Sequence, residues 1–337
     1  GTPWQAKFLN QPLLTFATER HDGDRGRRIA LAVPSTGQID IMAFKKMEEG
    51  SYYIVRVNEL FGKACDGATI EFPSAVAEAF EVDGQERRIG KATVRNGKLT
   101  FDIGKFGIRS FAVRFADTSA PAKPVQEQLL LAYDADILSD DAVRSDGRMG
   151  RSEQTLPAEM LPDTITSEGI DFAIRGREKG ADNAVECRGQ QITLPAGDYD
   201  RIYLLAAAEE EAAGRFEVDG AEQWLDIAKW KGFVGQHYAQ TIVPDSTAYK
   251  TLAVDNPYLR KDPIAWFASH CHAPKRNIAY QYCYLYKYGL DIVPGAKTLT
   301  LPDNPCIKIV AVTVAKEGVR SVPLTPLYDD FDDYPVF

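Results

Sequence analysis

Apolar and polar residues alternate along much of this chain with a period of two, which is the pattern of half-buried β-strands. The clearest case is the segment 280–288, in which five tyrosines occupy every second position. Rings at this spacing share one face of an extended strand and cannot share one face of a helix. Two interpretations of that face stay open: burial against a second sheet with the hydroxyls at the rim, or contact with a ligand at one end of the strand.

Short strand-like runs separated by turn signals occupy residues 1–116. The dipeptides Asp83-Gly84 and Asn96-Gly97 lie between such runs and favour the tight turns of β-hairpins. Six or seven strands at this spacing predict a β-sandwich. Residues 117–128 carry two prolines among small and polar residues, and this composition predicts a semi-extended linker.

Residues 129–316 repeat the strand pattern with longer loops. Continuous apolar runs at 201–208 and 307–315 predict strands that are covered on both faces. We expect an eight- or nine-stranded jelly roll here, so the predicted fold class is all-β, a β-sandwich followed by a jelly-roll β-sandwich. Residues 317–337 mix aspartates with aromatic residues without a periodic apolar face, which predicts a disordered or loosely docked tail.

Length and charge narrow the function classes. A chain of 337 residues is long enough for two domains that each bury a core. Its net charge of -9 argues against a nucleic-acid partner, because such binding requires a basic patch. No apolar run approaches the ~20 residues that span a bilayer, and the start at Gly1 shows no signal-peptide pattern that would indicate a compartment.

The five cysteines form no C-x-x-C motif and are an odd number for a disulfide framework. Cys271 and Cys283 lie inside strand patterns, where free cysteine behaves as a small buried apolar residue. We expect free thiols, with a Cys271–Cys283 bridge between neighbouring strands as the alternative.

His270 and His272 are two residues apart, so both side chains should point to the same face of a strand. This is the spacing of a two-histidine metal arm, whose ring nitrogens can converge on one ion. A third ligand would be His237 or an aspartate, and Cys271 faces the other side. A polar strand end, or contacts with a sugar, is the alternative interpretation.

Aspartates crowd the start of the second region. Asp134, Asp136 and Asp140 are the candidates for a structural calcium ion, because calcium prefers several oxygen ligands in a flexible loop. Their order is not that of the helical calcium loop. A solvated acidic loop therefore stays open beside a calcium site.

Several residues of the second region offer the chemistry of sugar recognition, in which aromatic rings stack on apolar sugar faces among polar groups. The candidates for carbohydrate contact are Trp230, His237, Trp266, His270, His272 and Tyr280. Core packing of the tryptophans is the alternative. No nucleophile elbow, zinc-protease helix or phosphate-binding glycine loop is present, so we do not expect catalysis by this chain alone.

Residues 10–115 resemble the last β domain of glycoside hydrolase family 38, the α-mannosidases. The shared motifs, in the family's order, are Asn10-Gln11-Pro12-Leu13, His21-x-Gly23, Ala43-Phe-Lys45-Lys46-Met-Glu48, Ile54-Val-Arg56-Val-x-Glu59, Gly62, Asn96-Gly97 and Ile108-Arg109-Ser-Phe111. Phe44 departs from the family's usual aliphatic residue. The resemblance implies a parent enzyme that cleaves α-mannosidic bonds with retention, using an aspartate nucleophile and a zinc ion. Both belong to an upstream α/β domain outside this chain, so no cofactor is expected in the chain itself.

The second region resembles the galactose-binding-like jelly rolls attached to bacterial glycosidases. The resemblance rests on Gly150-x-x-x-Gln-Thr-Leu-Pro157-Ala-Glu-x-Leu161-Pro and on residues 266–272. Together the two resemblances imply the non-catalytic C-terminal portion of an α-mannosidase-like enzyme, which completes and stabilises that enzyme and makes an accessory glycan contact. The alternative is an independent pair of carbohydrate-binding modules without catalysis.

The same resemblances imply partners and a location. The partners are the upstream catalytic domain and glycans that contain mannose or galactose, and the location is periplasmic or otherwise extracytoplasmic. Candidates for the join to the catalytic domain are Lys45, Lys46, Arg56 and Glu59. Exposed pairs among them would contribute ~0–1 kcal/mol each. Arg56 follows an apolar pair, and a buried arginine needs a carboxylate such as Glu59 or a partner domain.

Overall fold

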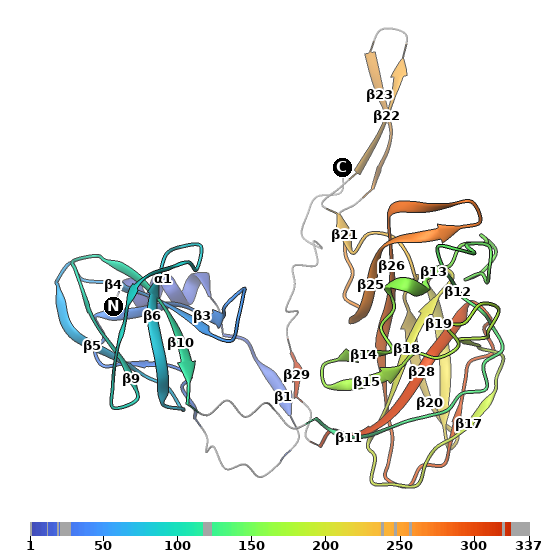
Figure 1. The fold of residues 1–337 in the computed structure, drawn as a ribbon, viewed down its shortest axis with the longest axis horizontal. Coiled ribbons are helices and arrows are strands. Elements are labelled where there is room, and N and C mark those ends of the chain that lie inside the picture. The colour runs from blue at the N-terminus through green and yellow to red at the C-terminus, as the bar shows by residue number, and fades with distance from the viewer. Residues whose placement is uncertain are drawn as a thin grey trace. The chain divides into compact units, whose positions relative to one another are not determined.

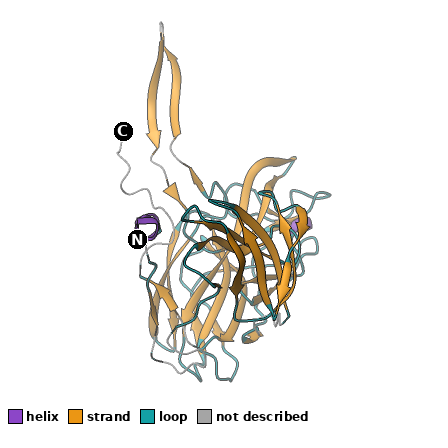
Figure 2. Ribbon diagram, turned by 90° about the vertical axis from the view of Figure 1, so that its left-hand side faces the viewer, coloured by secondary structure: helices purple, strands orange, loops and turns teal. Residues whose placement is uncertain are grey.

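The computed structural model describes residues 2–11, 13–18, 20, 28–116, 123–236, 239–245, 248–255, 258–318 and 321–324. Across these residues the secondary structure is almost entirely β-strand, with one α-helix and one short 3-10 helix (Figure 1, Figure 2). The prediction of an all-β fold is confirmed. None of the described helices is long and apolar enough to cross a membrane. The chain divides into two compact units, unit 1 with Gly1–Leu13 and Arg20–Pro121, and unit 2 with Leu14–Glu19 and Ala122–Phe337.

Unit 1 is a β-sandwich of two antiparallel sheets. Its elements are α1 (Thr2–Asn10), β2 (Val33–Pro34), β3 (Ile39–Lys46), β4 (Tyr53–Glu59), β5 (Cys65–Glu71), β6 (Val76–Val82), β7 (Arg88–Lys91), β8 (Thr93–Arg95), β9 (Lys98–Ile103) and β10 (Ile108–Phe115). The five-stranded sheet has the order β3-β4-β10-β6-β7, and the four-stranded sheet has the order β2-β5-β9-β8. The predicted hairpin turn at Asn96-Gly97 joins β8 to β9, with φ of 51° and 71° at its two residues.

Alternation along the strands builds the core of unit 1. Val55 and Val57 of β4 point between the two sheets, where they join Leu99 and Phe101 of β9 in one buried cluster. The intervening residue positions of the five-stranded sheet point to its other side, which we call the outer face. This face has its own small apolar cluster, made of Ile54, Phe80, Val82 and Ala112. The five-stranded sheet is therefore apolar at the centre of both faces.

Unit 2 is a larger sandwich. Its elements are β1 (Phe16–Thr18), β11 (Val125–Gln128), β12 (Leu138–Ser139), β13 (Leu156–Pro157), the 3-10 helix η1 (Ala158–Met160), β14 (Thr164–Ser167), β15 (Ile170–Ala173), β16 (Val185–Glu186), β17 (Gln191–Thr193), β18 (Arg201–Ala208), β19 (Ala212–Val218), β20 (Ala221–Ile227), β21 (Gly235–Gln236), β22 (Ala239–Asp245), β23 (Ala248–Asp255), β24 (Tyr258–Leu259), β25 (Ile264–Ala273), β26 (Arg276–Asp291), β27 (Thr298–Thr300), β28 (Ile307–Lys316) and β29 (Ser321–Pro323). The larger sheet has the order β11-β28-β18-β26-β25, with β16 also paired to β28, and the smaller has the order β17-β27-β19-β20.

The two sheets of unit 2 enclose one core. All residues of β18, and all of β28 except the last, are buried, so the predicted coverage of these strands on both faces is confirmed. Leu204 and Val312, which are paired across β18 and β28, lie in the same buried cluster as Phe216 and Leu299 of the smaller sheet. A β-sandwich is therefore confirmed here too, and its likeness to galactose-binding jelly rolls stays a prediction.

Three segments outside the predicted second domain belong to unit 2, and one of them is β1, which lies within the range predicted for the first domain. Val125–Gln128, assigned to the linker from the sequence, forms β11, which pairs with β28. The sequence pattern did not reveal this strand, because most of its side chains are polar and an edge strand joins a sheet through its backbone alone. Ser321–Pro323, assigned to the tail, forms β29 and pairs with β1. The remaining tail residues 325–337 lie outside the described residues.

The tyrosine strand is β26. Tyr284, Tyr286 and Tyr288 are buried, and their hydroxyls bond to the segment 228–232 or to Asp262, so burial with satisfied hydroxyls is confirmed for these three. Tyr280 differs, because it is 79% exposed and has a φ of 60°. Ala268 pairs with Cys283 while His270 pairs with Ala279, so β26 carries extra residues at this point. The resulting bulge ends the aromatic face before Tyr280.

Candidate functional site

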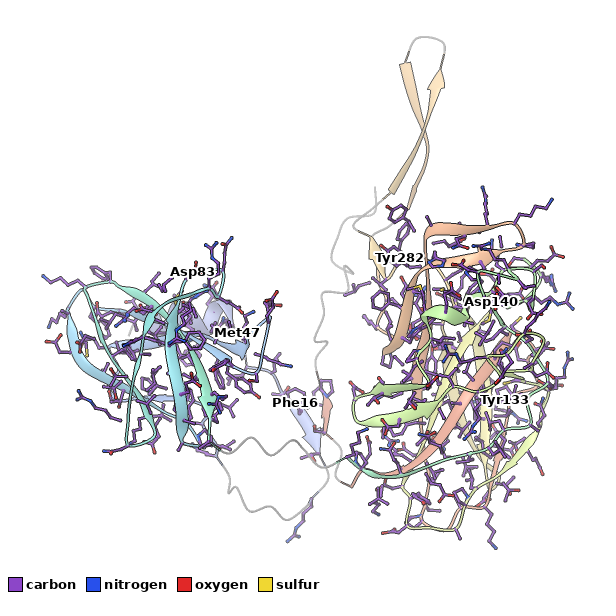
Figure 3. The ribbon with its side chains drawn as sticks, viewed as in Figure 1. Phe16, Met47, Asp83, Tyr133, Asp140 and Tyr282 are labelled. Atoms are coloured by element: carbon purple, nitrogen blue, oxygen red, sulfur yellow. The ribbon has the colours of Figure 1, made fainter. Side chains whose placement is uncertain are left out.

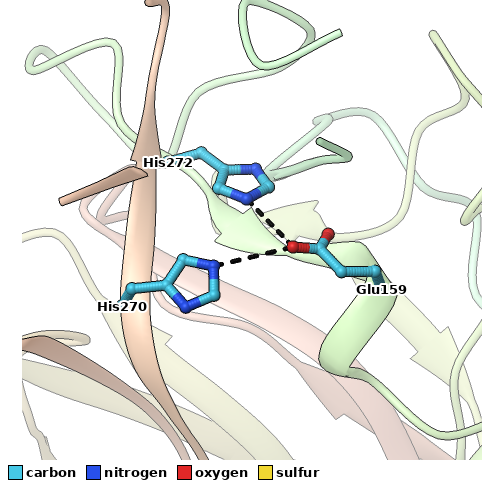
Figure 4. A group of neighbouring side chains, drawn as sticks. All are labelled: Glu159, His270 and His272. Carbon is cyan, nitrogen blue, oxygen red and sulfur yellow. Dashed lines mark hydrogen bonds and ion pairs between the residues drawn. The ribbon is translucent and has the colours of Figure 1, made fainter. Parts of the chain in front are cut away.

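The structure brings His270 and His272 of β25 together with Glu159 of η1 (Figure 4). Both histidines point to the same side of the strand, as predicted, and their ring centroids are 5.4 Å apart. The Glu159 Oε1 atom lies 3.1 Å from His272 Nε2 and 3.6 Å from His270 Nε2. Among the residues that the structure describes, this is the one group of at least three metal-binding side chains whose ligand atoms lie within 4.8 Å of one another.

The local fold explains how Glu159 reaches the two histidines. β25 is the last strand of the larger sheet, and Thr155 forms backbone hydrogen bonds with His272 in both directions, at 3.1 and 3.2 Å. β13 and η1 follow directly, so Glu159 projects back over β25. The indole N–H of Trp266 donates to Met160 O at 3.2 Å and fastens η1 to the same strand.

His272 is fully buried and bonded at both ring nitrogens. Its Nδ1 lies 2.9 Å from Ser139 Oγ, and Ser139 in turn bonds to the Thr155 hydroxyl. The Nε2 atom faces Glu159 and lies 3.5 Å from Asp141 Oδ1. This network fixes the ring plane, because each of its polar atoms has a partner on a different segment.

Asp141 carries a second negative charge beside His272. Hydrogen bonds from Asn277 and then from Arg144 lower the pKa of its carboxyl below the usual value, and both bonds outweigh desolvation. The carboxylate is therefore ionised over the physiological range. Sequence reasoning proposed an aspartate or His237 as the third partner of the two histidines. The structure instead supplies Glu159, with Asp141 further out, and His237 lies outside the described residues.

A serine, a histidine and a carboxylate in contact raise the question of a hydrolytic triad. Ser139 is only 4% exposed and its hydroxyl is bonded to Thr155, so a substrate carbonyl cannot reach it. The contact is structural. What the group offers is a set of imidazole and carboxylate ligands, the chemistry of transition-metal sites.

A cavity of about 300 Å³ adjoins the group. It is lined by Asp140, Ala158, Glu159, Arg177 and Glu178. Arg177 is held there by Asp163 at 2.5 Å and by the Ala158 carbonyl at 3.2 Å. The Glu159 carboxylate is 33% exposed, so the group can be reached from solvent through this side.

The other predicted carbohydrate contacts do not form a platform. Trp230 is fully buried and Trp266 is 9% exposed, so neither ring can stack on a sugar, and core packing is the correct interpretation for both. His272 is fully buried as well. Of the predicted contacts that the structure describes, Tyr280 alone presents most of its surface to solvent.

A groove that is lined by none of the predicted carbohydrate contacts lies on the smaller sheet. Trp224 of β20 is 65% exposed and lines a cavity of about 340 Å³. Polar side chains surround the ring, namely Arg215, Glu217, Thr300, Asp303 and Asn304. The period-two pattern of residues 221–227 could have revealed it, because Trp224 shares its strand face with Glu222 and Asp226, and two charged residues indicate the solvated side of a sheet.

The calcium candidates do not converge. Asp140 lies on the loop after β12 (Figure 3). Asp134 and Asp136 line a cavity of about 810 Å³, whereas Asp140 lines the cavity beside Glu159. Asp134 accepts the backbone N–H of Glu186, and Asp140 accepts the N–H groups of Ala142 and Val143. These carboxylates hold loops in place. Desolvation is the main reason why the pKa of Asp136 is raised, which also disfavours a charged ligand.

The interface candidates of unit 1 separate into two groups. Lys45 and Arg56 lie on the outer face, where Lys45 pairs with Glu48 at 2.5 Å and Glu86 at 2.8 Å. Arg56 donates from Nε to Ser110 Oγ at 3.0 Å, and no described carboxylate lies within ion-pair distance of it. The expected Arg56–Glu59 pair is wrong, because residues three apart on a strand point to opposite faces. Lys46 is exposed.

Glu59 has a different role from the one predicted. It is 2% exposed, and its carboxylate accepts backbone hydrogen bonds from Phe61, Gly62, Lys63 and Phe106. Desolvation raises the pKa of Glu59, but the hydrogen bonds to its charged form outweigh that effect and lower it overall. Glu59 therefore fastens two loops of unit 1. All five cysteines are free thiols, so the Cys271–Cys283 bridge is absent.

Comparison with solved structures gives remote likenesses. One is an uncharacterized protein, lmo2446, from Listeria monocytogenes EGD-e, with 9% sequence identity over 79% of this chain and a TM-score of 0.21. Another is the isomalto-dextranase of Arthrobacter globiformis T6 in complex with panose, with 9% identity over 80% of this chain and a TM-score of 0.18. This chain spans 20% of the first protein and 36% of the second. No curated protein matches the sequence.

Two family models match, one in each unit. Residues 38–111 match the glycosyl hydrolases family 38 C-terminal beta sandwich domain, in the region where the sequence motifs resemble that family. Residues 125–318 match the AziU2-like beta-sandwich domain, and this range begins with β11 and contains both sheets of unit 2. Because the second match covers more than half of the chain, the chain belongs to the AziU2-like β-sandwich family.

Proposed function

We propose that this chain is a non-catalytic portion of an α-mannosidase-like glycoside hydrolase, and that it completes and stabilises that enzyme. The match of residues 38–111 to the C-terminal sandwich of family 38 carries the proposal. The matched range runs from the beginning of the five-stranded sheet into its central strand β10. The catalytic zinc ion and the aspartate nucleophile then belong to an α/β domain elsewhere in the same protein.

The outer face of unit 1 supports this role, because it has the make-up of a docking surface. Its apolar centre is covered by polar side chains, with the Arg88 guanidinium 4.8 Å from the centroid of the Phe80 ring. Tyr52 donates to Glu78 at 2.9 Å, and Arg114 pairs with the same carboxylate at 2.8 Å. Because Ile54, Phe80, Val82 and Ala112 are at most 8% exposed, this face would meet a partner through its tyrosine and arginine side chains, residue types that are enriched at protein interfaces.

Arg56 is a partly buried arginine of this face. Its guanidinium bonds to a hydroxyl rather than to a carboxylate. A bidentate carboxylate on a docked domain would satisfy the donors that remain. We therefore place Arg56 and its neighbour Lys45 at the contact with the catalytic domain.

The test is association and activity with the segment encoded upstream of this chain. Alone, this chain should not hydrolyse p-nitrophenyl α-mannoside, and the joined protein should hydrolyse it. Arg56→Glu should weaken co-elution of the two separately expressed parts, whereas the control Lys98→Glu, on the other sheet of unit 1, should not. Hydrolysis by this chain alone, or an upstream segment without histidine and aspartate metal ligands, would contradict the proposal.

A second function, accessory glycan binding, is favoured by the Trp224 groove. A largely exposed tryptophan ring in a concave site, with carboxylate, amide and guanidinium groups around it, matches the requirements of sugar recognition. The groove replaces the strand-end platform proposed from the sequence, whose tryptophans are buried.

Calorimetric titration with mannose and galactose oligosaccharides tests this binding. Saturable binding that is lost in Trp224→Ala and kept in Tyr280→Ala would support the groove. Tyr280 is the matched control, because it is the exposed aromatic residue of the original proposal. If binding were lost in Tyr280→Ala and kept in Trp224→Ala, the glycan site would lie at the strand end. If no glycan gave a heat of binding, neither the groove nor the strand end would be a binding site.

A further inference from the structure

We propose that Glu159, His270 and His272 bind a divalent transition-metal ion, with Zn²⁺ as the representative of the class. The site lies in unit 2 and is independent of the catalytic zinc expected for an α-mannosidase. The proposal rests on the geometry of the group, on the fixed orientation of the His272 ring, and on a buried His270 nitrogen that has no hydrogen-bond partner and only a longer ion-pair contact, 3.6 Å, with Glu159.

The distances suit a tetrahedral ion. Zinc bonds of about 2.0–2.1 Å place neighbouring tetrahedral ligands about 3.3 Å apart. The observed separations of Glu159 Oε1 from the two Nε2 atoms are 3.1 and 3.6 Å, on either side of that value. The widest separation in the group is within 4.8 Å. A small rotation of the His270 side chain, which is 19% exposed, would shorten this widest separation to the distance that a tetrahedral ion requires.

His272 is oriented as a metal ligand. Nδ1 lies 2.9 Å from Ser139 Oγ and Nε2 faces Glu159; in the metal-bound form Ser139 Oγ would accept from Nδ1, and the lone pair on Nε2 would face the ion. A hydrogen bond from the far ring nitrogen to a fixed acceptor is the usual second shell of a metal-bound histidine. Full burial of the ring and the two backbone bonds to Thr155 prevent it from turning away.

His270 supplies the observation that points to a ligand. Its Nε2 atom is buried and has no hydrogen-bond partner among the described residues. A buried polar atom without a partner is rare in native proteins and calls for an explanation. Coordination of a metal ion satisfies this nitrogen without moving the backbone.

The local charge favours a divalent cation. Glu159 contributes one carboxylate and Asp141 another, 3.5 Å from His272 Nε2, while Arg144 offsets part of this charge. Three protein ligands leave one coordination position open, and the cavity of about 300 Å³ reaches Glu159. The alternative is a protonated histidine paired with Glu159, which needs no metal.

Calorimetric titration of the chelator-treated chain with Zn²⁺ distinguishes the two. We expect one ion per chain for the unchanged protein and for the control Glu178→Gln, which lines the same cavity without touching the group. His270→Ala and Glu159→Gln should bind Zn²⁺ more than about 100-fold more weakly than the unchanged chain. Loss of a residue that only supports a ligand already lowers metal affinity by about 10–100-fold, and these two residues are ligands themselves. Bound Co²⁺ should show the intense visible absorption of a tetrahedral site.

Two results would overturn the assignment. One is the absence of saturable binding to the unchanged chain. The other is a Zn²⁺ affinity of His270→Ala and Glu159→Gln that equals the affinity of the unchanged chain, since an ion held elsewhere in the chain would persist in both variants. Because replacement of the fully buried His272 can unfold unit 2, the decisive variants are the two partly exposed ligands, each checked for an unchanged thermal transition. The outcome does not depend on mannosidase activity.

Discussion

Replacement of Tyr288 by phenylalanine tests the structural role of the aromatic strand most directly. The ring is 7% exposed, and the hydroxyl accepts the buried N–H of Ala228 at 2.7 Å while it donates to Asp262 at 3.2 Å. Removing the hydroxyl leaves the N–H without a partner, which costs about 1–3 kcal/mol. Asp262 is half-buried, so a water molecule can replace the Tyr288 hydroxyl as its hydrogen-bond donor. The lost contact with Asp262 therefore adds little to the cost in free energy.

The measurement is urea unfolding followed by tryptophan fluorescence, since three of the four tryptophans lie in unit 2. With a slope near 2 kcal/mol/M, the midpoint of Tyr288→Phe should fall by about 0.5–1.5 M at an unchanged slope. Tyr280→Phe is the matched control, and its free energy of unfolding should stay within ~0.5 kcal/mol. Equal midpoints for the two variants would refute the reasoning that the buried hydroxyl is structural.

Tyr288 should also change how the stability of the protein depends on pH in the alkaline range. Burial, chiefly, raises the pKa of Tyr288 above its ordinary value of 10.0. The unfolded chain therefore loses this proton at a pH where the folded chain keeps it, and stability falls as the pH rises above about 10. Tyr288→Phe should lose stability less steeply than the unchanged protein over that range.

Three further predictions follow from burial and hydrogen bonding. Trp230→Ala should lower the free energy of unfolding by about 3–5 kcal/mol, because the ring is fully buried, while Trp224→Ala should change it by less than ~0.5 kcal/mol; urea unfolding measures both. Because the pKa of Glu59 is lowered from 4.5, its contribution to stability is present above that pH and lost as the pH falls through the folded value; acid unfolding of Glu59→Gln should lack this component. In the native protein, a thiol reagent should modify the half-buried Cys65 and Cys306 first, whereas burial raises the pKa of Cys187 to about 12 and it should react only after unfolding.

Local patterns determined much of the fold. Period-two alternation, Asn-Gly turns and continuous apolar runs are properties of single strands and single turns, so the all-β class and the two buried strands β18 and β28 could be predicted. β11 could not, because Val125–Gln128 exposes polar side chains and joins the sheet through backbone pairing that side-chain polarity does not report. The Arg56–Glu59 pair failed for a simpler reason, since it ignored the alternation of strand faces.

The two histidines of the candidate site could be predicted from the sequence, whereas Glu159 could not. The i, i+2 spacing places His270 and His272 on one face of a strand, and that step required only local geometry. Glu159 is more than 100 residues away, and its approach depends on where the β12–η1 segment crosses the sheet. Its motif, Leu156-Pro-Ala-Glu, resembles glycosidase modules, but nothing in the motif indicates which strand the carboxylate faces.

Because His270 and His272 lie on β25, an ion bound by them and Glu159 would also affect the edge of the larger sheet. β25 ends the larger sheet, and an unpaired strand edge is a site for unwanted pairing. Thr155 bonds to the backbone of His272 on that edge, and Glu159 and Ser139 hold the side chain of the same residue. An ion shared by Glu159 and the two histidines would therefore tie the covering segment to the edge strand. Amide exchange at residues 270–273 and 155–159 should slow together on addition of Zn²⁺, while exchange in β18, which is buried on both faces, should not change.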